Sequence, residues 1–255
     1  MIPKELKLFF CAVQFLTRIP TPALRDFQPE WIQQSARYYP LVGALVGGIA
    51  AAVLYAASHI WTPLITAILC VAASMAVTGC FHEDGLADTA DGIGGGQTRD
   101  RRLEIMKDSR LGTYGASVLI LNLGLKVACL STLVAINPIL AVIGLIGSNT
   151  FGRTAAVMAM AIMPYGGHHG MAKEGKPDKT SSLNVIIALA FGILSVIALP
   201  SFAAPVAVLA GLTTAAVPAL LAWRLLGGRT GDVLGAVEQC FEIGFLLALS
   251  AVLTQ

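Results

Sequence analysis

The chain has 255 residues, of which 56% are hydrophobic and only 13% are charged, and its mean hydropathy is +0.74. This composition is typical of a membrane protein and excludes an ordinary soluble domain. The net charge of +2 is too small to indicate nucleic acid binding. We therefore expect the lipid bilayer, and no nucleic acid, among the partners of this chain.

The first predicted element is a helix within residues 3–20, PKELKLFFCAVQFLTRIP. Its polar residues recur every three or four positions and form a narrow stripe, which consists of Lys4, Lys7, Cys11, Gln14 and Arg18. A helix that lies in the membrane interface fits this pattern best. The alternative is a helix that packs against the rest of the protein.

About seven later stretches are apolar enough to cross a bilayer, which takes roughly 20 residues each. They lie at approximately 40–58, 63–80, 115–135, 139–163, 184–200, 203–223 and 233–252. In the first of them, Gly43 and Gly47 have the small-xxx-small spacing that favours close helix packing. The predicted fold class is all-α: a polytopic integral membrane helix bundle, with about seven transmembrane helices plus an N-terminal interfacial helix, in a single domain (1–255).

The charges divide the connections between these spans into two alternating sets. Lys, Arg, Asp and Glu are absent from the connections near 59–62, 136–138 and 200–204 and from the C-terminal tail. Nearly all charges fall in 1–37, 81–114, 164–183 and 224–232. By the positive-inside rule the charged side is cytoplasmic, so the N-terminus is predicted inside and the C-terminus outside. The connection that contains His168 and His169 is interpreted as an exposed connector, with a mobile lid as the alternative.

Residues 81–96, FHEDGLADTADGIGGG, gather four carboxylates in an otherwise apolar chain. Asp84, Asp88 and Asp91 stand at i, i+4 and i+7, so they share one face of a helix that continues from the second span. Like charges at this spacing repel, and a hard divalent cation would offset the repulsion. We predict a Mg²⁺ site at these three aspartates, with Asp88 also catalytic, although a solvated acidic loop is an alternative. The role of Glu83 is left open.

Basic residues follow the acidic segment and recur in the last loop. Four of them are candidate contacts for a phosphate group of the substrate: Arg102, Lys107, Arg110 and Arg229. The alternative is that Arg and Lys gather in cytoplasmic loops in any case. At the entry to the third span, the backbone of Ser109, Gly112, Thr113 and Gly115 could form an anion-binding nest.

The last span contains carboxylates where they are costly. Asp232 stands where an N-cap is expected, and Glu238 lies about 9 Å farther along the helix axis, at 1.5 Å per residue. Glu238 and Glu242 could complete a metal shell, act as a general base or pair with buried cations. We expect Lys126 to form an ion pair and leave Arg153 open. Asp232 and Glu238 are both kept as candidate catalytic bases.

The segments HEDGLADTADG, DRRLEIMKDSRLGTYG and GGRTGDVLGAVEQ, with an early FLTRIP, together resemble the bacterial cobalamin synthase family, the adenosylcobinamide-GDP ribazoletransferases. The resemblance runs from about Phe15 to Glu242. It implies a multi-pass enzyme of the bacterial inner membrane, with its active site facing the cytoplasm, that joins adenosylcobinamide-GDP to α-ribazole or its 5′-phosphate and releases GMP. Magnesium is the metal of this family, and the family's acidic signature falls on Asp84, Asp88 and Asp91.

Three other classes of membrane protein fit the sequence less well. The CDP-alcohol phosphotransferases need an Ala-Arg pair and two further spaced aspartates after the first ones, and this chain has neither. Intramembrane prenyltransferases need two Asp-rich motifs, and only one is present. An ion-coupled transporter often shows paired halves, and no internal symmetry appears. The phosphorylation state of the acceptor, the binding of the corrinoid and the formation of a homo-oligomer are left open.

Overall fold

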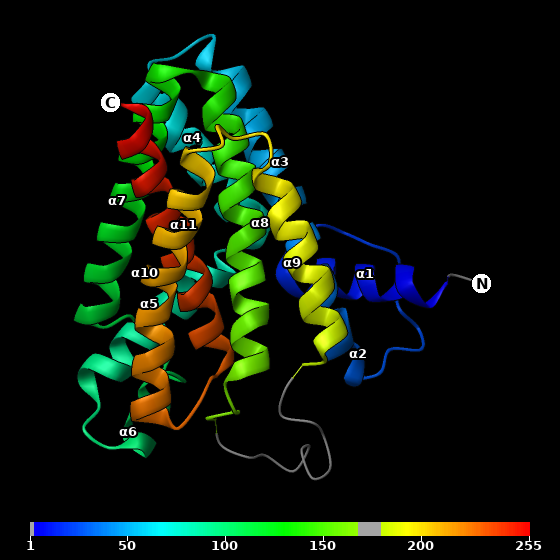
Figure 1. Ribbon diagram of the computed structural model, residues 1–255. Coiled ribbons are helices and arrows are strands. Elements are labelled where there is room, and N and C mark those ends of the chain that lie inside the picture. Colours follow the sequence, from blue (N-terminus) through cyan, green and yellow to red (C-terminus); the bar gives the residue numbers. More distant parts are fainter. Residues whose placement is uncertain (1–2, 168–179) are drawn as a thin grey trace.

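The computed structural model describes residues 3–167 and 180–255, and it is helical almost throughout this part of the chain (Figure 1). The short elements are α1 (Lys4–Leu16), α2 (Glu30–Gln34), the 3₁₀ turn η1 (Ser35–Tyr38) and α6 (Arg99–Ile105). The longer ones are α3 (Tyr39–Ser58), α4 (Pro63–Thr78), α5 (Phe81–Gly95), α7 (Thr113–Ile136), α8 (Pro138–Ile162), α9 (Ser182–Val196), α10 (Ala203–Leu226) and α11 (Gly231–Leu253). The all-α prediction is confirmed, while the connection around His168 and His169 lies outside the described residues.

Seven helices coincide with the seven predicted spans, but they differ in length. Among the described residues, five helical segments are long and apolar enough to cross a membrane on their own, and these contain α3, α7, α8, α10 and α11. Helix α4 has 16 residues and α9 has 15, both short of the roughly 20 that a span needs. The predicted number of seven is therefore approximate, since the structure supports five spans, or six if α4 and α5 form one broken span.

Two of the seven helices form the centre of the bundle. Of the apolar 18-residue stretch within each helix, 72% is buried in α8 and 61% in α11, compared with 33% in α7 and 28% in α10. Close packing against α8 is possible because α3 presents glycines: a Cβ on Gly43 would collide with the carbonyl of Asn149, and one on Gly47 would lie 3.0 Å from the Cα of Ile146. The small-xxx-small spacing therefore has the packing role expected of it.

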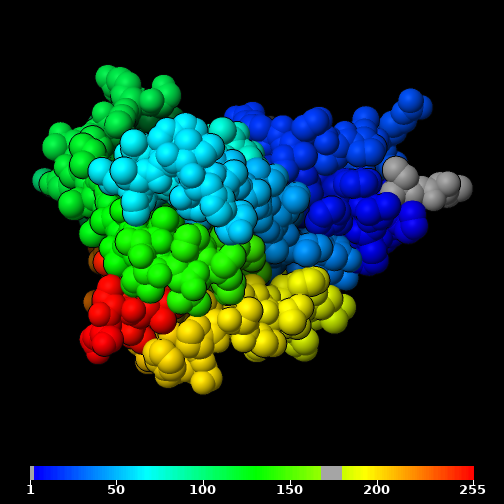
Figure 2. Space-filling model, turned by 90° about the horizontal axis from the view of Figure 1, so that it is seen from above, coloured from blue at the N-terminus to red at the C-terminus, as the bar shows by residue number. Residues whose placement is uncertain are grey.

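The short connections at one end of the bundle are fixed by local signals. The side chain of Asn137 accepts a hydrogen bond of 2.8 Å from the backbone N–H of Ile139, and Pro138 occupies the first helical position of α8. Figure 2 looks onto this end, where the α3–α4, α7–α8 and α9–α10 connections lie together with the C-terminus. These connections contain no Lys, Arg, Asp or Glu. Helix α6 and the loop that joins it to α7 lie at the opposite end (Figure 1).

Helix α1 lies across the direction of the long helices and projects to one side of the bundle (Figures 1 and 2). It packs against α2, η1 and α3. Leu8, Cys11 and Val13 are buried in this contact, so the stripe that contains Cys11 is not uniformly solvent-facing. The packing alternative is thus confirmed, and the crosswise orientation is the one that an interfacial helix adopts.

The prediction that the acidic segment continues the second span is wrong. The chain turns at Gly79 and Cys80, both of which have left-handed backbone conformations with φ of 66° and 60°. A Cβ on Gly79 would also lie too close to the Arg18 side chain, so this position suits glycine for two reasons. As a result α5 leaves α4 at an angle of 89° and runs across the bundle instead of along it. Its acidic residues are thereby brought against α7 and α11.

Candidate active site

Helix α5 carries the carboxylates, and its glycine side lies directly on α11. A Cβ on Gly85 would lie 2.8 Å from the carbonyl oxygen of Asp232, and the backbones of Gly85 and Gly235 are also close. Only a residue without a side chain permits this approach. It brings the first turn of α11, with Asp232, next to the stretch of α5 that contains Asp84 and Asp88.

A cavity of about 510 Å³ opens beside this stretch of α5. Its acidic wall is formed by α5, and the opposite side is formed by the α6–α7 loop and two leucines of α7. The lining residues are Met75, Cys80, Glu83, Asp84, Ala87, Asp88, Met106, Lys107, Asp108, Ser109, Arg110, Leu111, Leu119 and Leu123. We call it the carboxylate cavity. Four predicted site residues meet in it, namely Asp84, Asp88, Lys107 and Arg110.

Asp84 and Asp88 have no side-chain partner in the described part of the cavity. Among the described residues, neither carboxylate has a hydrogen-bond or ion-pair partner, although Asp88 is only half-exposed. Burial is the largest cause that raises the pKa of Asp88 to about 7, and the nearby carboxylates of Asp84, Asp232 and then Asp91 raise it further. The cavity is therefore a place where a cation would be stabilised.

These two carboxylates fit a magnesium ion that is shared with a phosphate ligand. Mg²⁺ prefers hard oxygen ligands and is commonly held by one or two carboxylates plus substrate phosphates. Within residues 3–167 and 180–255, no three His, Cys, Asp or Glu side chains converge in a way that could hold a metal ion between them. The donor set thus supports a pair of aspartate ligands, and it does not support a cage made of protein alone.

Asp91, the third predicted ligand, is engaged elsewhere. It is buried, and its two oxygens accept hydrogen bonds of 2.8 Å from the backbone N–H groups of Gly112 and Gly115 at the start of α7. A carboxylate in this position satisfies free N–H groups of the helix and favours its dipole. The predicted backbone nest therefore exists but holds Asp91, and Asp91 does not line the carboxylate cavity. This geometry argues against a direct role in metal binding.

The four predicted phosphate-binding cations separate into two groups. Lys107 and Arg110 line the carboxylate cavity, where the hydrogen bonds from the Arg110 guanidinium lower the pKa of Asp108 to about 2. Arg102 instead reaches the C-terminal end of α10, with its guanidinium 3.4 Å from the carbonyl oxygen of Leu225. Arg229 lies in the α10–α11 loop and does not line this cavity. Only the first two are positioned beside the aspartates.

The start of α11 differs from the prediction by two residues. The cap is Thr230, whose hydroxyl accepts a hydrogen bond of 3.2 Å from the backbone N–H of Val233, so the expectation that Asp232 is the N-cap is wrong. Thr230 has the extended backbone that a cap requires, whereas Asp232 already lies in the first helical turn. In that position Asp232 is close enough to raise the pKa of Asp88.

Comparisons with known proteins identify the family of this chain. The family model described as cobalamin-5-phosphate synthase matches residues 8–250. The chain belongs to this family. Similar proteins named adenosylcobinamide-GDP ribazoletransferase occur in Leptothrix cholodnii (42% identity, 95% of this chain and 94% of the relative), Azorhizobium caulinodans (41%, 93% and 93%) and Shewanella piezotolerans (40%, 98% and 96%). No solved structure matches the chain.

In this member of the cobalamin synthase family, an ionic cluster lies behind the carboxylate cavity. Arg153 lies 2.8 Å from Glu238, and Lys126 lies 2.6 Å from Glu242, with all four side chains buried. The expected ion pair of Lys126 is confirmed, and Arg153 has the same role. Because Glu238 is fully buried and paired, and does not line the cavity, its position argues against the predicted function as a general base.

Glu83 is the residue that sequence reasoning left unassigned. It is buried, it lines the carboxylate cavity, and its Oε1 accepts a hydrogen bond of 3.3 Å from the side chain of Gln239 on α11. Gln239 in turn accepts a hydrogen bond from Lys126 and donates one to Glu238. Glu83 thus connects the cavity to the ionic cluster. In the sequence, Glu83 is only one more acidic residue beside Asp84. Its inward direction depends on the 89° bend between α4 and α5, which the sequence did not predict.

Proposed function

We propose that this chain joins adenosylcobinamide-GDP to α-ribazole, or to α-ribazole 5′-phosphate, and releases GMP. The products are adenosylcobalamin or its 5′-phosphate. The observation that carries the proposal is the carboxylate cavity, in which the unpartnered Asp84 and Asp88 face Lys107 and Arg110. The names of the relatives, which cover nearly the whole chain, support the choice of substrates.

The reaction is a substitution at phosphorus. A ribose hydroxyl of the acceptor forms a new P–O bond to the cobinamide-bearing phosphorus of the diphosphate, the P–O bond to GMP breaks, and the hydroxyl proton passes to a base. Asp84 and Asp88 would hold Mg²⁺, which neutralises charge on the diphosphate when it is bound. Lys107 and Arg110 would bind phosphate oxygens on the opposite side. Asp232 would be the base: it does not line the carboxylate cavity, but it lies close enough to Asp88 to raise the pKa of that carboxyl, whereas Glu238 is paired with Arg153.

The location that we propose is the bacterial inner membrane, with the carboxylate cavity facing the cytoplasm. The support comes from charge. The end of the bundle near the cavity carries α6 and the basic α6–α7 loop, while the opposite end has no charged connection. Positive residues are retained on the cytoplasmic side of spanning helices.

The test is a reconstituted assay with purified protein in liposomes, adenosylcobinamide-GDP, α-ribazole or its phosphate, and Mg²⁺. GMP release and the corrinoid product are both measured, so that simple hydrolysis is separated from transfer. Asp84→Asn and Asp88→Asn should each abolish most of the activity. Asp100→Asn is the matched control, since Asp100 is an exposed carboxylate on α6 that does not line the cavity. Full activity in both cavity variants would refute the assignment of this site.

A further inference from the structure

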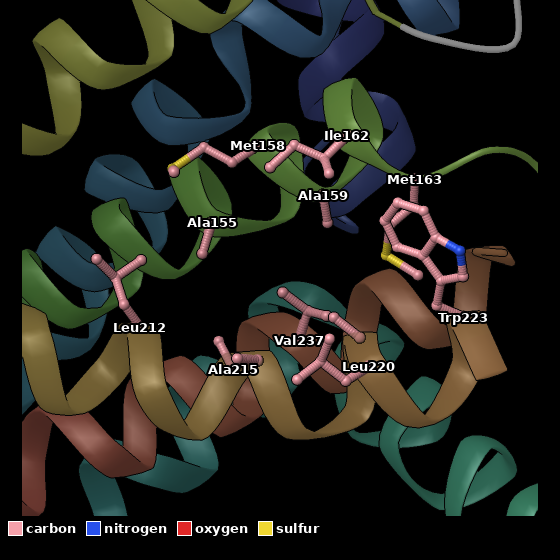
Figure 3. A pocket seen from close by; sticks show the side chains of 12 residues that line it. Ala155, Met158, Ala159, Ile162, Met163, Leu212, Ala215, Leu220, Trp223 and Val237 are labelled. Atoms are coloured by element: carbon pink, nitrogen blue, oxygen red, sulfur yellow. The ribbon is translucent and has the colours of Figure 1, made fainter.

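A second cavity, lined only by apolar side chains, lies between α8, α10 and α11. Its volume is about 320 Å³. In Figure 3, Ala155 and Ala159 of α8 face Leu212, Ala215 and Leu220 of α10 across an open gap, with Trp223 at one end. Alanines line much of the gap and leave it unfilled. We call this cavity the acyl groove.

The acyl groove is separate from the proposed active site and is open to the surroundings of the bundle. It shares no lining residue with the carboxylate cavity. Three of its larger side chains, Ile162, Leu220 and Trp223, are between 44% and 56% exposed. Because α10 has the length and apolarity of a membrane span, these side chains face the lipid.

The length of the groove matches one leaflet of a bilayer. From Leu212 to Trp223 the helix advances roughly 16 Å at 1.5 Å per residue. That is about half of the ~30 Å hydrocarbon core. Trp223 lies at the end of the groove near α6, because α6 contacts the last turn of α10 through Arg99, whose Nε donates to the carbonyl oxygen of Leu226 at 2.9 Å. Tryptophan prefers the level of the lipid headgroups, so this end corresponds to a membrane surface.

The volume of the groove, about 320 Å³, suits a single acyl chain. A single hydrocarbon chain is thin enough to enter it, and apolar walls offer such a chain dispersion contacts without burying a polar group.

We propose that the acyl groove binds one phospholipid, with an acyl chain between α8 and α10 and the headgroup beside Trp223. The exposed Arg224 is the only charged residue of α10 and lies at the same end, next to where the lipid phosphate would be. Such a lipid would fill the gap that the small residues leave and would join α10 to α8. This inference is independent of the proposed reaction.

The experiment uses Trp223 as the reporter. The chain has three tryptophans, and Trp31→Phe with Trp61→Phe leaves Trp223 alone. Purified protein of this background in detergent is titrated with phosphatidylglycerol whose acyl chains are brominated, and Trp223 fluorescence is recorded. Native mass spectrometry counts the bound lipid. We expect quenching that saturates at one lipid per protein.

Two substitutions provide the comparison. Ala216→Phe fills the groove and should abolish the saturable quenching. Ala216→Leu fills less of the groove and should weaken the quenching, and it replaces Ala216→Phe if that variant does not fold. Val217→Phe is the matched control, because Val217 is exposed on the same helix but does not line the groove. Quenching that does not saturate, or that is equal in the Ala216 and Val217 variants, overturns the proposal. A dimer that Ala216→Phe dissociates also overturns it, since the occupant would then be a second copy.

Discussion

Asp91→Asn separates the structural aspartate of α5 from the two that face the cavity. In the wild type, Asp91 accepts hydrogen bonds from two backbone N–H groups at the start of α7. A hydrogen bond to a charged group contributes about 1.5–3 kcal/mol. The asparagine can accept only one of the two bonds and also loses the charge that favours the helix dipole, worth about 0.3–1 kcal/mol. The expected loss of stability is therefore about 2–4 kcal/mol.

This loss should be visible in thermal unfolding of the purified protein. For a chain of this size, 1 kcal/mol corresponds to about 2–4 °C, so a loss of about 2–4 kcal/mol should lower Tm by roughly 4–16 °C. The Mg²⁺ concentration that gives half-maximal GMP release should not change. Asp84→Asn is the comparison, with a Tm that does not fall and an altered Mg²⁺ requirement for its residual activity. If Asp91→Asn instead keeps the wild-type Tm and needs more Mg²⁺, Asp91 is a metal ligand and the interpretation of α5 is wrong.

Three further outcomes follow from the same geometry. Arg153→Met should destabilise the fold by about 3–5 kcal/mol, because Glu238 loses its buried partner, and Arg153→Met with Glu238→Gln should recover part of this loss in chemical unfolding. The pKa of Asp88 is raised to about 7 in the folded state, so the ionisation of Asp88 opposes folding. Without Mg²⁺, Asp88→Asn should therefore be more stable than the wild type at pH 8. This difference in stability should vanish as the pH falls below the unfolded pKa of about 4. Gly85→Ala should lower activity by pushing α5 away from α11, whereas Gly124→Ala, at a position with open space, should not.

The fold could be predicted largely from composition. Apolar length and charge alternation locate the spans within a few residues, because the bilayer imposes both on the sequence. The bend before α5 could not be predicted in this way. Its cause is two consecutive left-handed residues, and the second of them, Cys80, is not a glycine. A hydropathy pattern contains no information on that backbone geometry.

The site was predictable as a set of residue types but not as an arrangement. The i, i+4, i+7 spacing correctly places Asp84 and Asp88 together, but it also includes Asp91, because helical periodicity alone cannot show that Asp91 meets the amide groups of α7. The same limit applies to Glu238. A carboxylate inside a span indicates either function or pairing, and the choice depends on Arg153, which lies 85 positions away in the sequence and is brought into contact only by the packing of α8 on α11.

The way in which α5 is held explains how two unpaired carboxylates are kept at the wall of the carboxylate cavity. Asp84 and Asp88 repel each other, so a loosely attached helix would rotate both toward solvent. Here α5 is fixed at three positions: the Gly85 contact with α11, the hydrogen bond of Glu83 with Gln239, and the bonds of Asp91 to α7. The repulsion therefore persists in this arrangement and would be relieved by a bound cation. Weakening the Gly85 contact or the Glu83–Gln239 hydrogen bond, the two attachments on either side of Asp84, should reduce affinity for Mg²⁺ and diphosphate together, because the arrangement of the two carboxylates depends on the position of the helix.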